Sequence, residues 1–336
     1  MPGIILANCG LPAPLCRATL SFDAPMDPDS MAFGETFLTQ PDLFPARQSG
    51  EQWGRERVVI RVAGNEFICE GLSPIQADAV RARFGDLCAD EAAEPQSAVV
   101  LHVYRAAATD FIGGEDDWEY AFDLDYAPTA VMFAGFHFMG RLDWLPQLQA
   151  AVWTSEDRLM VANAIFENVL RVVAAYRLLD GGGVLLHSAA VADDRGAYVF
   201  FGPSGAGKST ISRLGHATGR AVLSDDMNAL RVTPDGVMVE QLPFAGDFGH
   251  AGTSATGSYP VRNLCTLEKG LDPQLKPLAS APAIAALLGC APFVNRNPYR
   301  FDALVAKLEA LSASLPVQAL TFAPDNRCWE LLRHEQ

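Results

Sequence analysis

The segment that most constrains this chain is a loop between an apolar run and a helical pattern. Residues 202–210 read Gly-Pro-Ser-Gly-Ala-Gly-Lys-Ser-Thr, with glycine, lysine and serine at the offsets of a phosphate-binding loop. Glycines let successive backbone N–H groups turn inward around an anion. The lysine reaches terminal phosphates, and the serine hydroxyl can ligate Mg²⁺. The motif therefore predicts a nucleotide phosphate site.

The flanking sequence supports this prediction. Ala197–Phe201 is a short apolar run typical of a buried strand, and a helical pattern begins at Ser209. A helix in this place directs the positive end of its dipole at the bound anion. We expect the chain to bind a nucleoside di- or triphosphate through Gly202, Ser204, Gly205, Ala206, Gly207, Lys208, Ser209 and Thr210.

Composition excludes several other classes of protein. The 336 residues include 40 acidic and 25 basic side chains, a net charge of −15 that disfavours a nucleic-acid partner. No apolar stretch has the length of a membrane span, and the start of the sequence has no basic signal region, so we expect a cytoplasmic protein without a membrane partner. The widely spaced cysteines indicate reduced thiols, and the apolar run around Cys290 assigns that residue to the core.

The chain divides into three segments that differ in composition and in hydrophobic pattern. Residues 1–55, rich in proline and glycine, are expected to form an irregular N-terminal arm. Residues 56–154 are typical of a small β-rich α+β domain, for which substrate or partner recognition is a hypothesis. Residues 155–336 contain the phosphate-binding loop and are expected to form a P-loop domain.

Local patterns predict several elements of the β-rich segment. Residues 58–62 and 66–70 are expected to form a hairpin, and Ser73 to cap a helix over 74–84. Thr154 and Asp157 resemble a capping box for a long helix with one broad apolar face, ending at residues 181–183. Further strands are predicted over 98–104, 118–124, 130–139 and 150–153, with an acidic loop at 114–117 that is a solvated turn or a metal site.

A histidine and two aspartates are expected near the loop. If Ala192 pairs with Ala197 in a hairpin, His187 lies opposite Gly202, where it is either a phosphate contact or a packed core residue. Asp225 and Asp226 end a predicted strand, 16 positions after Ser209. A carboxylate there can hold Mg²⁺ and a second can accept a proton from an attacking hydroxyl, although a turn or cap is the alternative.

Other candidates are less specific. Residues 243–250, with Asp247 and His250, form a glycine-punctuated loop that is either a lid or substrate contact, or a hairpin connection. Lys269 and Arg262 are candidates for charge near the phosphates, with a plain surface position as the alternative for each.

His187, residues 202–210 and residues 223–226, in this order, resemble the core of HPr kinase/phosphorylase and, more closely, of HPr-kinase-like serine kinases. The resemblance covers about residues 180–270. It implies an α/β fold with a phosphate loop in a mixed sheet, shared with phosphoenolpyruvate carboxykinase. It also implies that Asp225 is the general base, Asp226 and Ser209 hold the metal, and His187 and Lys208 contact the phosphates.

The resemblance implies a Mg²⁺-dependent kinase that transfers the γ-phosphoryl group of ATP to a hydroxyl, with a serine on a protein or peptide as the expected acceptor. Two alternatives stay open: a kinase of a small serine-like metabolite, and a nucleotide-gated binding or scaffold protein. The identity of the acceptor, the donor (ATP, GTP, ADP or pyrophosphate) and the oligomeric state, a homo-oligomer included, also stay open.

Overall fold

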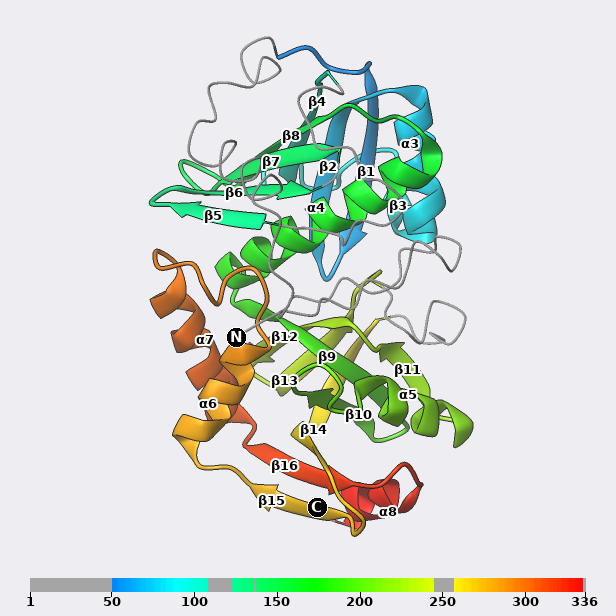
Figure 1. The fold of residues 1–336 in the computed structure, drawn as a ribbon, viewed down its shortest axis with the longest axis vertical. Coiled ribbons are helices and arrows are strands. Elements are labelled where there is room, and N and C mark those ends of the chain that lie inside the picture. The colour runs from blue at the N-terminus through cyan, green and yellow to red at the C-terminus, as the bar shows by residue number, and fades with distance from the viewer. Residues whose placement is uncertain (1–49, 108–122, 136, 245–256, 335–336) are drawn as a thin grey trace, which may run out of the picture. The chain divides into compact units, whose positions relative to one another are not determined.

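The computed structural model describes residues 50–107, 123–135, 137–244 and 257–334. These residues form a mixed α/β protein with two mixed sheets of eight strands each and six α-helices. They divide into two compact units, the first ending at Val173 and the second beginning at Ala174. Helix α4 (Leu159–Asp180) runs through this division (Figure 1).

The first unit is built on a sheet with the strand order β3-β1-β2-β4-β8-β7-β6-β5. Helix α3 (Pro74–Phe84) packs against β1 and β2. The strands are β1 (Glu56–Val62), β2 (Asn65–Leu72), β3 (Cys88–Ala89), β4 (Val99–Arg105), β5 (Asp123–Ala127), β6 (Ala130–Gly135), β7 (Phe138–Asp143) and β8 (Gln149–Thr154), and a short 3₁₀ helix covers Gly85–Leu87.

The predicted hairpin and capped helix of this unit are confirmed. Strands β1 and β2 pair in antiparallel register, with Val62 opposite Asn65 at the turn. At the start of α3, the Ser73 hydroxyl oxygen accepts the N–H of Gln76, and the Gln76 side chain accepts the N–H of Ser73. This reciprocal pair satisfies two donors that the first turn of a helix leaves open.

Two local predictions in this unit are wrong. The run 130–139 is not one strand but the hairpin β6–β7, whose turn includes His137 with a φ of 63°. Thr154 does not cap the long helix, because it ends β8 and its hydroxyl donates to the carbonyl of His137 at 2.7 Å. Helix α4 begins only at Leu159. The acidic loop at 114–117 and most of the predicted strand 118–124 lie outside the described residues.

The second unit contains the other sheet, with the strand order β10-β9-β12-β13-β14-β16-β15 and β11 paired with β9. Its strands are β9 (Gly183–Asp193), β10 (Gly196–Phe201), β11 (Ala221–Ser224), β12 (Met227–Thr233), β13 (Gly236–Gln241), β14 (Ser258–Lys269), β15 (Gln274–Pro277) and β16 (Val317–Phe322). Its helices are α5 (Lys208–Ala217), α6 (Ser280–Gly289), α7 (Phe301–Ser314) and α8 (Arg327–His334), together with the end of α4.

Strand direction brings several strand ends to one edge of this sheet. Strand β14 is parallel to both β10 and β16, so the carboxyl ends of all three meet. Strand β9 is antiparallel to β10 on one side, and to β11 and β12 on the other. Ligands of α/β proteins bind beyond carboxyl strand ends, which makes this edge the place to look for a site.

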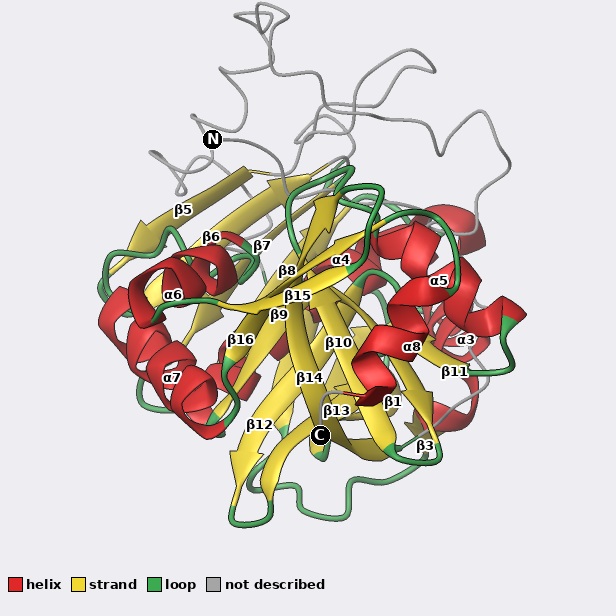
Figure 2. Ribbon diagram, turned by 90° about the horizontal axis from the view of Figure 1, so that it is seen from below, coloured by secondary structure: helices red, strands yellow, loops and turns green. Residues whose placement is uncertain are grey.

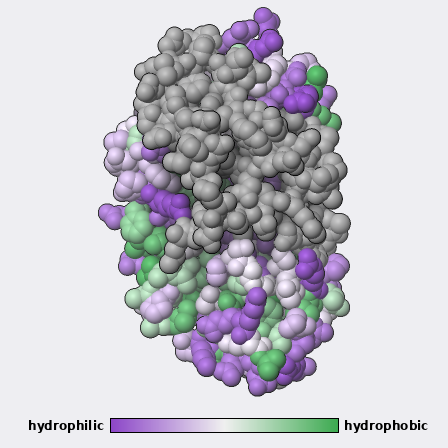
Figure 3. Space-filling view, viewed as in Figure 1, coloured by the Kyte–Doolittle hydropathy of each residue, from purple (hydrophilic) through white to green (hydrophobic). Residues whose placement is uncertain are grey.

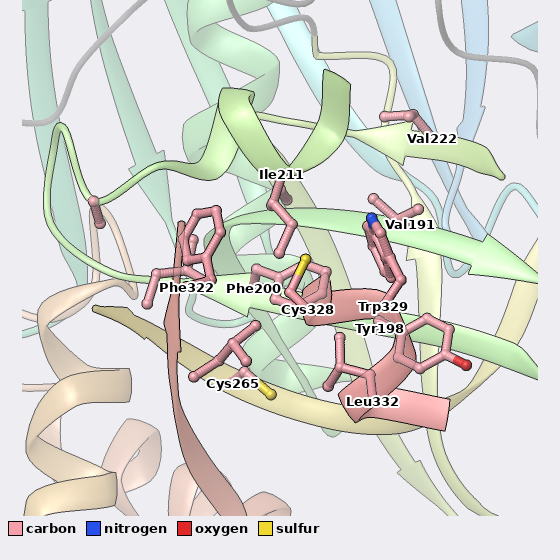
Figure 4. Close-up of a cluster of buried hydrophobic side chains, with 14 residues drawn as sticks. Val191, Tyr198, Phe200, Ile211, Val222, Cys265, Phe322, Cys328, Trp329 and Leu332 are labelled. Carbon is pink, nitrogen blue, oxygen red and sulfur yellow. The ribbon is translucent and has the colours of Figure 1, made fainter. Parts of the chain in front are cut away.

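A hydrophobic cluster fixes α5 and α8 to one side of these strands. Ile211 of α5 and Trp329 of α8 both contribute to a buried cluster with Phe200 of β10 (Figure 4). The Trp329 ring meets the Phe200 ring edge-on, with 5.7 Å between centroids. Helices α6 and α7 pack together on the other side of the strands (Figure 2). The helix that follows the phosphate-binding loop is therefore anchored directly to the core.

Helix α4 differs from its predicted single apolar face, because its residues from Ile165 to Tyr176 are buried on every side. The buried stretch includes charged residues, and these are paired: the Glu167 carboxylate accepts from the guanidinium groups of Arg171 and Arg83, each at 2.7 Å. Within the described residues, no helix has both the length and the apolar composition needed to cross a membrane. The visible surface of the second unit mixes hydrophilic and hydrophobic residues (Figure 3).

Glu66 links β2 to the segment that follows β3. Its carboxylate accepts the backbone N–H groups of Ala93 and Glu94, each at 2.9 Å, and the guanidinium of Arg61 at 2.9 Å. These contacts, with the Ala93 amide making the largest contribution, lower the pKa of Glu66 from 4.5 to about 2. A lowered pKa in the folded state stabilises the protein above pH 4.5, and this contribution is lost as the pH falls toward 2.

We therefore expect Glu66→Gln to lower the free energy of unfolding at pH 7. The difference from the wild type should shrink as the pH falls from 4.5 toward 2, because the carboxyl group is then protonated in both states. Urea unfolding over this pH range measures the effect, and Glu309→Gln on the exposed side of α7 is the control for loss of a charge. A difference that stays constant with pH would contradict this account.

Candidate functional site

The phosphate-binding loop connects the carboxyl end of β10 to the first turn of α5. Its three glycines, Gly202, Gly205 and Gly207, have φ angles of 151°, 74° and 115°, which only glycine adopts readily. The backbone conformation of the loop thus requires the glycines of the motif. Because α5 begins at Lys208, the N–H groups of its first turn and its positive dipole end lie at the loop.

Lys208 folds back onto the loop that it follows. Its ammonium donates to the carbonyl oxygen of Gly202 at 3.0 Å and to that of Pro203 at 3.4 Å, and the residue is buried. These carbonyls hold the positive charge of the lysine next to the backbone amides of the loop. Such an arrangement of N–H groups and an ammonium is suited to an anion.

The predicted register between β9 and β10 is confirmed. Ala192 pairs with Ala197 and Ser188 pairs with Phe201, so His187 comes next along β9, beside Gly202. On its other side, His187 pairs with Met227 of β12. A single strand thus carries His187 between the phosphate-binding loop and the segment that connects β11 to β12.

Asp225 and Asp226 form that connecting segment, and both are buried. The Ser188 N–H donates to the Asp226 carbonyl oxygen at 3.0 Å, which ties the segment to β9. A carboxylate oxygen of Asp226 lies 3.7 Å from Nε2 of His187. The segment is also a turn, since the Ser224 hydroxyl oxygen accepts the Asp226 N–H at 3.2 Å. The two aspartates therefore belong to a turn and also lie where a functional site was predicted, so the two interpretations are compatible.

Cys290 belongs to this site, although sequence reasoning assigned it only to the core. Its carbonyl oxygen accepts the His187 N–H at 2.8 Å. Burial raises the pKa of the Cys290 thiol, opposed by the nearby charge of Lys208 and by the N–H of Gly202. Cys290 follows α6, and its apolar sequence gives no sign that tertiary packing brings it to the loop.

The structure separates the two basic candidates. Arg262 lies near the start of β14, at the opposite end of the sheet from the loop, and donates to the carbonyl of Arg195. Lys269 is the last residue of β14 and borders a pocket together with Gly207 and Thr210. Asp247 and His250 lie outside the described residues.

These residues lie in a row along one edge of the sheet. The aspartates follow β11, His187 lies on β9, the loop follows β10, and Lys269 ends β14. An anion in the loop would have a carboxylate and an imidazole on one side and an ammonium on the other. Carboxylate oxygens and a serine hydroxyl are suitable ligands for Mg²⁺, and an imidazole can donate to phosphate oxygens.

Comparison with models of known protein families and with curated protein sequences gave no match.

Two glycines of the loop offer a matched test of its geometry. A Cβ atom on Gly207 would lie 2.8 Å from the Phe322 ring, whereas a Cβ on Gly205 would meet nothing within 4 Å. We expect Gly205→Ala to cost about 1 kcal/mol of stability for its positive φ, and Gly207→Ala about 3 kcal/mol because of the added clash. Urea unfolding measures both variants, and equal costs would contradict the packing of Phe322 under the loop.

Proposed function

We propose that this protein is a Mg²⁺-dependent kinase of the HPr-kinase-like type, with the P-loop fold that it shares with phosphoenolpyruvate carboxykinase. It transfers the γ-phosphoryl group of ATP to a hydroxyl group, with a serine of a protein or peptide as the acceptor. The observation that carries the proposal is the meeting of the loop, His187 and Asp226 across β9. A loop that only bound nucleotide would not require a carboxylate pair at the phosphate end.

We assign binding of the triphosphate to the backbone N–H groups of the loop and to the positive charge of Lys208. The loop amides and the N-terminus of α5 surround the phosphates, and Lys208 exchanges its loop carbonyls for phosphate oxygens. The 3.0 Å contact to Gly202 keeps the ammonium at the loop before nucleotide arrives. The lysine therefore needs little reorganisation to stabilise charge on the transferred group.

Ser209 and Asp226 would hold Mg²⁺. Their hydroxyl and carboxylate oxygens are hard ligands of the kind that this ion prefers, and Asp226 is 2% exposed at the edge where the loop begins. The ion would neutralise charge on the phosphoryl oxygens. His187, 3.7 Å from Asp226, is placed to donate a hydrogen bond to a phosphate oxygen.

Asp225 is assigned as the general base. It accepts the proton of the acceptor hydroxyl as that oxygen forms a bond to the γ-phosphorus, while the bond from this phosphorus to the bridging oxygen of ADP breaks. The products are a phosphate monoester, ADP and a proton on Asp225. Burial of Asp225 to 5% exposure limits access of bulk water to the base.

The first test of the function follows the label from γ-labelled ATP. Purified protein, Mg²⁺ and labelled ATP are incubated with and without an extract of proteins and metabolites from its own cell. We expect label in a protein or peptide. Label in a small molecule would instead identify a metabolite kinase, and tight nucleotide binding without transfer would favour the scaffold alternative.

Two substitutions separate binding from chemistry. We expect Lys208→Ala to weaken nucleotide binding and abolish turnover, because it removes charge at the phosphates. Asp225→Asn should leave ATP affinity nearly unchanged and lower the rate by about two to four decades, which is the usual contribution of a general base. Single-turnover rates and calorimetry measure both, with Asp235→Asn in the exposed β12–β13 turn as control. Full activity in Asp225→Asn would show that another group is the base.

A further inference from the structure

A pocket of about 430 Å³ opens beside the phosphate-binding loop, on the side of β14 and β16. Its walls come from three places: the start of α5, the turn after β14 and the turn after β16. They are mostly apolar, and they consist of Ala206, Gly207, Thr210, Lys269, Gly270, Leu271, Phe322, Ala323 and Pro324. The volume is within the range of small-molecule sites.

The pocket and the catalytic candidates lie on opposite sides of the loop. Strand β10, which leads into the loop, has β9 with His187 on one side and β14 on the other. The pocket also reaches Thr210, at the end of the motif whose backbone cradles the α- and β-phosphates. A triphosphate whose γ-phosphate faces His187 therefore directs its nucleoside toward the pocket.

The rim of the pocket is a fixed turn with an exposed apolar side chain. Leu271 is 84% exposed, yet its carbonyl oxygen accepts a guanidinium N–H of Arg327 at 2.6 Å. Arg327 is held in turn by Asp325 at 2.9 Å. The neighbouring Gly270 N–H donates to the Phe322 carbonyl at 3.1 Å, which joins the two turns that form the walls. The backbone of Leu271 is thus held in place at the rim, and its exposed side chain is where a ligand would cover it.

We propose that this pocket holds the base and ribose of the nucleotide, with Leu271 and Pro324 as apolar contacts to a purine ring. This inference rests on the proposed function, because it takes the loop as the triphosphate site. The Phe322 ring lies under the loop at Gly207 and joins the base site to the phosphate site.

The same walls predict weak discrimination between purines. Among the described residues that line the pocket, the only side-chain donors or acceptors are the Thr210 hydroxyl and the Lys269 ammonium. Strong selection between related ligands requires buried polar groups that one ligand satisfies and the other leaves unpaired, whereas apolar contact discriminates weakly. We expect the dissociation constants for ATP and GTP to agree within about tenfold.

The test compares a nucleotide with its phosphates alone. Calorimetry in Mg²⁺ measures the binding of ATP, GTP and inorganic tripolyphosphate to the wild type, Leu271→Ala, Ala323→Trp and Lys208→Ala. Leu271→Ala should raise the dissociation constant for ATP about threefold to tenfold and leave that for tripolyphosphate unchanged, because only apolar contact is lost. Ala323→Trp, which fills the pocket, should have a larger effect on ATP. Val232→Ala, which truncates a 39% exposed residue at the far end of β12, is the matched control.

The outcomes separate this inference from the proposed function. If Leu271→Ala and Ala323→Trp leave ATP affinity unchanged while Lys208→Ala lowers it, the base site is overturned and the nucleotide function stands. If the wild type binds neither ATP nor tripolyphosphate, both are overturned. A preference of more than about a hundredfold for one purine would overturn the weak discrimination, since apolar walls do not supply it.

Discussion

The hydrogen bonding of β9 on both of its sides determines where the candidate site forms. In the middle of this strand, the pairing with β10 ends at Ser188 and the pairing with the start of β12 begins at His187. Three segments distant in the sequence are therefore held at one level of the sheet: the loop after β10, the Asp225–Asp226 turn and the segment at Cys290. A slip of one residue in either pairing would turn His187 to the other face and separate these groups.

The core beneath the phosphate-binding loop supports the pocket as well as the loop. Phe322 ends β16, belongs to the same buried cluster as Ile211 of α5, and lies under Gly207. Protein interiors are closely packed, so a small change in the volume of one side chain affects its neighbours. In the proposed nucleotide site, substitutions at the cluster would therefore disturb phosphate and base binding together, whereas a substitution of Leu271 at the exposed rim would affect the base alone.

The part of the site that the sequence predicted well is local. The motif, its flanking strand and helix, and the β9–β10 register depend on neighbours along the chain, as does the cap at Ser73. The remaining features of the site and of the fold depend on packing between segments that are distant in the sequence. Nothing near Cys290 or Leu271 indicates a loop that is distant in the sequence, and the single apolar face expected of α4 gave no sign of burial on every side. The strand predicted over 130–139 failed for a local reason, because the chain reverses within an apolar run, where the signal for a turn is a single glycine, Gly135, at the end of β6.

Charge imposes a further condition on the proposed function. The chain has a net charge of −15, and two buried aspartates lie at the end of the sheet where the triphosphate would bind. Carboxylates close to phosphate repel it strongly in a site with little water. The loop amides, the α5 dipole and Lys208 offset part of this repulsion, and a divalent cation between the two sets of oxygens would reverse it. Nucleotide binding and Mg²⁺ binding are therefore expected to be coupled, each raising the affinity for the other by the same factor.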